Sequence, residues 1–199
     1  MEHGLLAERN LDVAEYWYSE AANHNYPPAQ LALSNLLCAK NKYAEAVDPL
    51  IKAAESGYVA AQYALASYYF IKENNSLLGY HWLEKAAGQG HALANEELAE
   101  AHFSGTHPDA DRQKGLTLLE RGAELGDMDC ALRLANHLLE QEDSKECTAE
   151  GLRWLRISAG KGNPMALMSL FQIYSFGIHG VTKDDELASV FLNLSRRYE

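Results

Sequence analysis

Residues 53–57 read Ala-Ala-Glu-Ser-Gly, and residues 86–90 read Ala-Ala-Gly-Gln-Gly. Related stretches occur at residues 21–25, 122–126 and 158–162, and the last residue is glycine in four copies and asparagine in one. Consecutive last residues are separated by 32, 33, 36 and 36 positions, a spacing that is typical of a repeat protein. Because glycine and asparagine most readily adopt the left-handed conformation that ends a helix, we expect each stretch to close a helix.

We call the last residue of each stretch the stop residue, and the sequence around it repeats as well. The stop residues are Asn25, Gly57, Gly90, Gly126 and Gly162. A small residue follows each by four positions: Ala29, Ala61, Ala94, Cys130 and Ala166. A leucine follows by eight positions: Leu33, Leu65, Leu98, Leu134 and Leu170. The residue eight positions before each stop residue is large in most copies: Trp17, Pro49, Trp82, Leu118 and Trp154. Small and large residues at fixed helical offsets predict two closely packed helices in each repeat.

The pattern predicts an all-α fold of about eleven helices. The composition agrees, because alanine, leucine and glutamate favour helices and no alternating strand pattern occurs. We expect a single solenoid over residues 1–199, a right-handed α/α superhelix of antiparallel helix pairs. An unpaired helix is predicted first, followed by five pairs: 10–24, then 27–56, 59–89, 92–125, 128–161 and 164–198. Residues 2–4 look like the tail of a preceding helix, so we expect the chain to open within a repeat.

The motif that runs from Ala54 through Gly57 and Ala61 to Leu65 and Tyr69 resembles the Sel-one-like repeat (SLR) family, a relative of the tetratricopeptide repeat. The helix 82–90, with its tryptophan and its Ala-Ala-x-x-Gly end, carries the same resemblance. The resemblance implies an adaptor in protein complexes, with the first helix of each pair lining a concave groove. The copies depart from the motif in places, since Pro49 replaces the tryptophan and the last helix lacks its terminal stretch.

Positions two before, two after and five after each repeat leucine are expected to face this groove. They are Leu31, Asn35 and Cys38; Tyr63, Ser67 and Phe70; Glu96, Glu100 and Phe103; Leu132, Asn136 and Leu139; Met168, Gln172 and Ser175. The set is apolar, amide and acidic, without Lys or Arg, which predicts an apolar or amphipathic segment of a partner whose basic residues meet Glu96 and Glu100. Alternatively, Phe70, Phe103 and Leu139 pack between adjacent helices.

Charge and composition exclude several other classes. Seventeen basic and 28 acidic residues give a net charge of -11, which disfavours nucleic acid and anionic membrane. No apolar run is long enough to insert into a membrane. Three cysteines at unrelated spacings fit neither a disulfide framework nor a metal motif. With no signal peptide in the first residues, the sequence is typical of a cytoplasmic protein, or of a periplasmic or secreted one if an upstream signal was removed.

Catalytic chemistry has little support in the sequence. No nucleophile elbow, P-loop or dinucleotide motif occurs, so we expect a protein that is not an enzyme and needs no cofactor. The alternative is an enzyme, or a metal or small-ligand binder, with a site between repeats where His102 and His137 meet acidic residues. A third possibility is self-association through the N-terminal helix.

Overall fold

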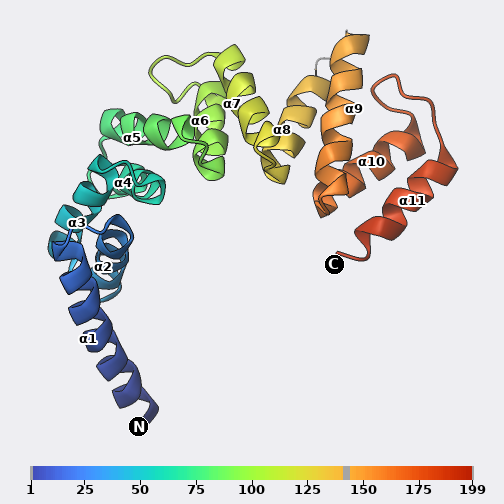
Figure 1. Cartoon of the computed structure of the whole chain (residues 1–199). Helices are drawn as coiled ribbons and strands as arrows, with labels where there is room; N and C mark the ends of the chain where they lie inside the picture. Colours follow the sequence, from blue (N-terminus) through green and yellow to red (C-terminus); the bar gives the residue numbers. More distant parts are fainter. Residues whose placement is uncertain (1, 141–143, 199) are drawn as a thin grey trace. The chain divides into compact units, whose positions relative to one another are not determined.

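The computed structural model describes residues 2–140 and 144–198, and these residues form eleven helices and no strand (Figure 1). The helices are α1 (Glu2–Asn23), α2 (Pro27–Ala39), α3 (Tyr43–Glu55), α4 (Val59–Ile71), α5 (Ser76–Gly88), α6 (Ala92–Ser104), α7 (Arg112–Glu124), α8 (Met128–Leu139), α9 (Lys145–Gly160), α10 (Pro164–Phe176) and α11 (Asp185–Ser195). The all-α prediction and the helix count are therefore confirmed.

The helices follow the predicted alternation of a first and a second helix in each repeat. We call α2, α4, α6, α8 and α10 the A helices, and α1, α3, α5, α7, α9 and α11 the B helices. Each A helix packs most closely on the B helix that follows it. The first helix differs from its prediction, because α1 begins at Glu2 rather than near residue 10. Gly4 does not interrupt it, since one glycine costs a helix only about 1 kcal/mol.

The stop residues end the B helices by the predicted mechanism. All five have a positive φ, from 56° at Asn25 to 96° at Gly126. At Gly57 the next amide, that of Tyr58, donates a 3.1 Å hydrogen bond to the carbonyl of Ala53, which satisfies an otherwise unpaired helix-end carbonyl. The same bond runs from His91 to Ala86. Glycine fits here because it has no Cβ to strain the left-handed backbone, and asparagine tolerates this conformation better than most other residues.

The chain divides into two compact units, residues 1–91 and residues 92–199. In the second unit the core is built from repeat positions that the sequence analysis identified, including Leu134, Trp154 and Leu170, all at most 4% exposed. In the first unit Leu65 and the paired alanines Ala53 and Ala54 are buried in the same way. Small residues at these positions let neighbouring helices approach closely.

Where one repeat position departs from alanine, its partner position compensates. Cys130 occupies the small position in the fourth repeat, and Gly122 stands where most copies have the first alanine of the Ala-Ala pair. A Cβ added to Gly122 would lie 2.5 Å from the Cys130 sulfur, so the larger thiol fits only because the glycine has no side chain. Burial raises the pKa of the Cys130 thiol to about 12, which keeps it protonated.

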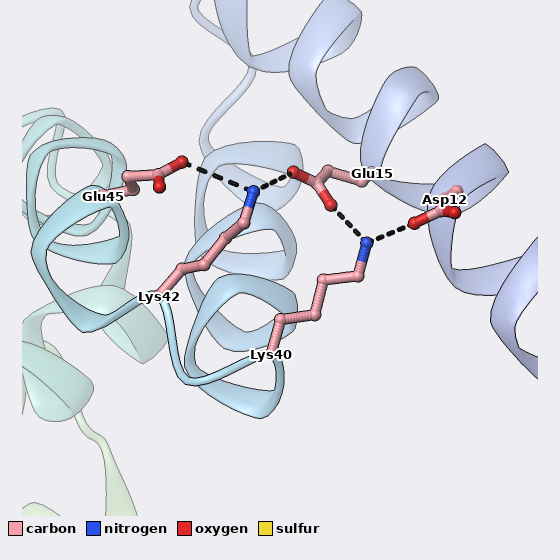
Figure 2. A network of polar contacts seen from close by, with 5 residues as sticks. All are labelled: Asp12, Glu15, Lys40, Lys42 and Glu45. Atoms are coloured by element: carbon pink, nitrogen blue, oxygen red, sulfur yellow. Dashed lines mark hydrogen bonds and ion pairs between the residues drawn. The ribbon is translucent and has the colours of Figure 1, made fainter.

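A network of charged side chains joins α1 to the turn between α2 and α3 (Figure 2). The Lys40 ammonium lies 2.5 Å from a carboxylate oxygen of Asp12 and 2.5 Å from one of Glu15. Lys42 reaches the other oxygen of Glu15 at 3.3 Å and Glu45 at 3.6 Å. Hydrogen bonds from Lys40 lower the pKa of both Asp12 and Glu15, and the hydrogen bond to Asp12 raises the pKa of Lys40.

We expect this network to make the packing of α1 depend on pH. Since the carboxyl pKa values are lowered on folding, their stabilisation is complete above about pH 4.5 and is lost as the pH falls through the lowered folded values. In Lys40→Gln the pKa of Glu15 should rise toward 4.5, and the stability difference from wild type should vanish in acid and in high salt. Carboxyl NMR titration and urea unfolding between pH 3 and 7 test this.

The matched control is Lys145→Gln, which removes one positive charge from an exposed site that has no ion pair within the described part of the chain. It accounts for the change in net charge alone. A Glu15 titration that is the same in wild type and Lys40→Gln would show that the network has no energetic effect.

Candidate functional site

The predicted groove positions form three rows along the A helices, which differ in what the side chains contact. The sixth-position row lies six residues after each stop residue: Leu31, Tyr63, Glu96, Leu132 and Met168. The tenth-position row is Asn35, Ser67, Glu100, Asn136 and Gln172. The thirteenth-position row is Cys38, Phe70, Phe103, Leu139 and Ser175. The residues of the first two rows are all half-buried or exposed, whereas the third row includes the buried Leu139.

Within each unit the sixth-position residues are apolar except for Glu96, and the tenth-position residues are polar. Four of the sixth-position residues are half-buried, and Met168 is 36% exposed. In the tenth-position row Asn35, Asn136 and Gln172 are exposed, and their amides have no hydrogen-bond partner among the described residues. An unpartnered amide offers both a donor and an acceptor, which is what a polypeptide backbone requires of a surface that binds it.

The acidic part of the predicted groove is already neutralised in part. Arg133 of α8 lies 2.7 Å from a carboxylate oxygen of Glu96 and 3.5 Å from one of Glu100. The expectation that the surface contains no Lys or Arg was therefore incomplete, because Arg133 reaches it from a position one residue beyond the sixth-position row. One guanidinium offsets one of the two carboxylate charges, which weakens the attraction for a basic partner.

The thirteenth-position row packs within the helix pairs instead of facing a groove. The rings of Phe70 and Phe103 lie over Gly79 and Gly115, where an added Cβ would come within 2.5 and 2.7 Å of ring carbons. Leu139 is 4% exposed, with a side-chain carbon 2.9 Å from the position of a Gly151 Cβ. These three side chains therefore contact the B helix of their own pair, and the Phe103 ring also contacts His137 of the next A helix. A role for them in binding a partner stays a prediction.

In three pairs a large A-helix residue faces a glycine of the B helix: Phe70 with Gly79, Phe103 with Gly115, and Leu139 with Gly151. In the first pair the smaller Cys38 and Ala46 occupy these positions and line one hollow together. The large residues fit because the glycines have no side chain.

A hollow of about 260 Å³ opens between α8, α10 and the loop that follows α10. Two predicted residues of the tenth-position row, Asn136 and Gln172, line it together, with the core residue Leu139 at its base. Residues that sequence reasoning missed complete the lining: Glu140, Ser169, Ile173, Ile178 and His179. The loop residue His179 has a φ of 56° and Gly180 a φ of 70°, a tight turn that the Gly-Ile-His-Gly sequence signals without showing what it faces.

The histidines expected for the alternative metal site have other neighbours. His102 accepts a 3.2 Å hydrogen bond from the Asp111 amide and its ring lies 4.4 Å from that of His107, which orders the loop between α6 and α7. The His137 ring lies 3.9 Å from that of Phe103, and burial lowers its pKa. Among the described residues no three His, Cys, Asp or Glu side chains are placed to hold a metal ion.

The N-terminal helix exposes the face that other B helices bury. Trp17 is 64% exposed and Tyr16 59%, whereas Trp82 and Trp154 at the repeat position of Trp17 are 9% and 3% exposed. This aromatic face is the surface through which self-association was predicted, and self-association stays a prediction. No helix in the described part of the chain is long and apolar enough to cross a membrane.

Comparisons with known proteins agree with this repeat architecture. The family model of the Sel1 repeat matches residues 1–26, 59–91, 92–127 and 164–189. The chain is 29% identical, over 113 residues and 55% of its length, to a sel1-like repeat-containing protein of Acanthamoeba polyphaga mimivirus, of which it covers 21%.

Two solved structures share the fold. One is c5321, a protective antigen of uropathogenic Escherichia coli strains with an SLR fold. It aligns with a TM-score of 0.78 and 25% identity, and the alignment covers 92% of this chain and 41% of the antigen. The other is a Sel1 repeat protein from Oxalobacter formigenes, which aligns with a TM-score of 0.77 and 22% identity over 93% of this chain and 78% of that chain. The chain thus spans less than half the length of the mimivirus protein and of the antigen. Since the family model covers more than half of the chain in the register of the stop residues, the protein belongs to the Sel1 repeat family.

Proposed function

We propose that this chain is a non-enzymatic protein-binding module that holds a peptide or a helix of a partner against the exposed face of its A helices. Proteins built from Sel1 repeats are generally protein–protein interaction scaffolds. The observation that carries the proposal is the hollow between α8 and α10, where Asn136 and Gln172 present unpartnered amides. Both side chains are exposed, so their donors and acceptors are available to a partner that enters the hollow.

The chemistry of the two exposed rows describes the partner. The half-buried Leu132 and the more exposed Met168 lie beside the amides of α8 and α10, so a segment with apolar side chains on one face and an accessible backbone fits best. Methionine adapts its shape to different apolar side chains at little cost. Because Arg133 already pairs with Glu96 and Glu100, a strongly basic partner gains little at α6.

The test combines crosslinking with affinity measurement. A photoreactive p-benzoylphenylalanine in place of Met168 should crosslink to a discrete partner in an extract, and the same group in place of Glu150, exposed on the B helix α9, should not. For the partner identified in this way, Asn136→Ala and Gln172→Ala should each weaken binding by about tenfold, since each removes a hydrogen bond to the partner. Isothermal titration calorimetry measures the change.

Glu150→Ala is the matched control for affinity, because it changes an exposed residue of the same unit away from the A-helix face. It should leave Kd unchanged. Equal crosslinking from positions 150 and 168, or equal Kd values for Gln172→Ala and wild type, would rule out the A-helix face as the binding surface.

A further inference from the structure

The first helix pair contains a hollow where two other pairs contain an aromatic ring. It has a volume of about 240 Å³ and lies between α2, α3 and α4. Its lining is almost wholly apolar and includes Cys38, Ala46, Val47, Tyr43 and Tyr68, with Lys72 beside them. We call it the Cys38 pocket. At this volume it is smaller than most small-molecule sites, which fits one side chain better than a whole ligand.

The repeat register explains why the pocket is there. Cys38 lies thirteen residues after its stop residue, the position of Phe70 and Phe103 in the next two pairs. Those phenylalanines fill the space beside α5 and α7 with a ring, and Cys38 does not. Ala46 stands at the repeat position of Gly79 and Gly115 and is larger than glycine by one methyl group. This methyl group fills only a small part of the volume that a phenyl ring occupies, so the rest of that volume stays empty in the first pair.

The surroundings of Phe103 show what an aromatic ring contacts at this place in a pair. Its ring lies over Gly115, 3.9 Å from the ring of His137, and 5.7 Å from the guanidinium carbon of Arg112. In the Cys38 pocket the equivalent positions are held by Ala46, Tyr68 and Tyr43, in that order.

A cation also lies beside the pocket, although it comes from Lys72 and not from the repeat position of Arg112. Lys72 places its ammonium 4.6 Å from the centre of the Tyr43 ring. The Cys38 pocket is therefore bordered by a small B-helix residue, aromatic rings and a nearby cation, the same kinds of group that surround the Phe103 ring.

We infer that the Cys38 pocket binds one aromatic side chain of a partner protein, which completes the first pair as Phe70 and Phe103 complete theirs. The inference rests on the proposed function, because the ring comes from a polypeptide held on the A-helix face, and it adds an anchor site in the unit formed by residues 1–91. Cys38 is exposed, so the pocket is open to a side chain that arrives from outside.

A tethered ring tests whether the pocket accepts an aromatic group. In a Cys147→Ser background Cys38 is the accessible thiol, because Cys130 is buried and its pKa is raised to about 12. Modification with benzyl methanethiosulfonate should raise Tm by about 2–4 °C over the methyl methanethiosulfonate adduct, since the ring becomes buried. The same two adducts on Cys147, in a Cys38→Ser background, should have equal Tm values. A benzyl adduct of Cys38 that is no more stable than its methyl adduct would overturn the inference.

A variant whose Cys38 pocket is filled by its own side chain tests whether the partner binds there. The double variant Cys38→Phe/Ala46→Gly rebuilds the Phe/Gly combination of the neighbouring pairs. Toluene should give a saturation-transfer NMR signal with wild type that the closed variant loses, and the partner's Kd should rise by about tenfold in the closed variant. A photoreactive group in place of Lys72 should crosslink to a partner peptide that contains Phe, Tyr or Trp near the linked atom.

These results separate the pocket from the A-helix face. If the closed variant binds toluene or the partner as wild type does, or if the crosslinked peptide has no aromatic residue, the inference is wrong while crosslinking from position 168 is unaffected. If no partner crosslinks at position 168, the proposed function fails, whereas the adduct and toluene results still report on the pocket.

Discussion

Replacing Trp154 with alanine should lower the free energy of unfolding by about 3–5 kcal/mol, and replacing Trp17 should change it by less than about 0.5 kcal/mol. The two tryptophans occupy the same repeat position, eight residues before a stop residue. Trp154 is 3% exposed in the core of the second unit, whereas Trp17 is 64% exposed on α1. The difference in cost follows from burial alone, because the residue type and helix position are matched.

The cost of Trp154→Ala is expected to be that of a cavity. The buried indole nitrogen of Trp154 has no hydrogen-bond partner in the described part of the chain, so the substitution removes apolar contacts and no hydrogen bond. Trp154→Phe should therefore restore a large part of the loss. Urea unfolding followed by circular dichroism measures all three variants without relying on tryptophan fluorescence. Equal destabilisation by Trp17→Ala and Trp154→Ala would show that Trp17 is buried in solution.

The helices could be predicted because their signals are local. Each stop residue is a glycine or asparagine at a position with positive φ, and the alanines and leucines around it repeat at fixed offsets. Exposure is a different matter, since it depends on which helix lies next to each face. Trp17 and Trp154 look alike in sequence, and only their neighbours in the structure distinguish them. The start of the first helix was also misplaced, because residues 2–4 look like the tail of a preceding helix whereas α1 begins at Glu2.

The candidate site could be predicted only in part for the same reason. The offsets placed Asn136 and Gln172 on one face, and both line one hollow. The offsets could not show that Arg133 turns toward Glu96, because this depends on the distance between α6 and α8. The offsets also could not show that the Phe103 ring packs on Gly115, because Gly115 lies on another helix. The pairing of a large residue with glycine in three pairs was nevertheless present in the sequence, as a correlation between two positions rather than a motif.

Gly115→Ala should destabilise the protein by about 1–3 kcal/mol, although the same change at an open helix position is neutral or stabilising by up to about 1 kcal/mol. The added Cβ would lie 2.7 Å from a ring carbon of Phe103, and the ring is confined on its other side by His137. Gly88 and Gly160 are the matched controls, because an added Cβ at either position meets no atom within 4 Å. Thermal and urea unfolding of the three alanine variants measure the contrast.

A second substitution distinguishes steric conflict from a general sensitivity of α7. Phe103→Ser/Gly115→Ala places two small residues at this contact, as Cys38 and Ala46 do in the first pair. Phe103→Ser alone removes ring contacts and Gly115→Ala alone crowds the ring, but in the double variant the alanine enters space that the ring has left. The double variant should therefore be more stable than the sum of the single changes predicts, by at least about 1 kcal/mol. Strict additivity would mean that the contact between residues 103 and 115 does not set the distance between α6 and α7. A coupling of the expected sign would establish that Gly115 makes room for the Phe103 ring, and the Cys38 pocket is the place in the first pair where such a ring is missing.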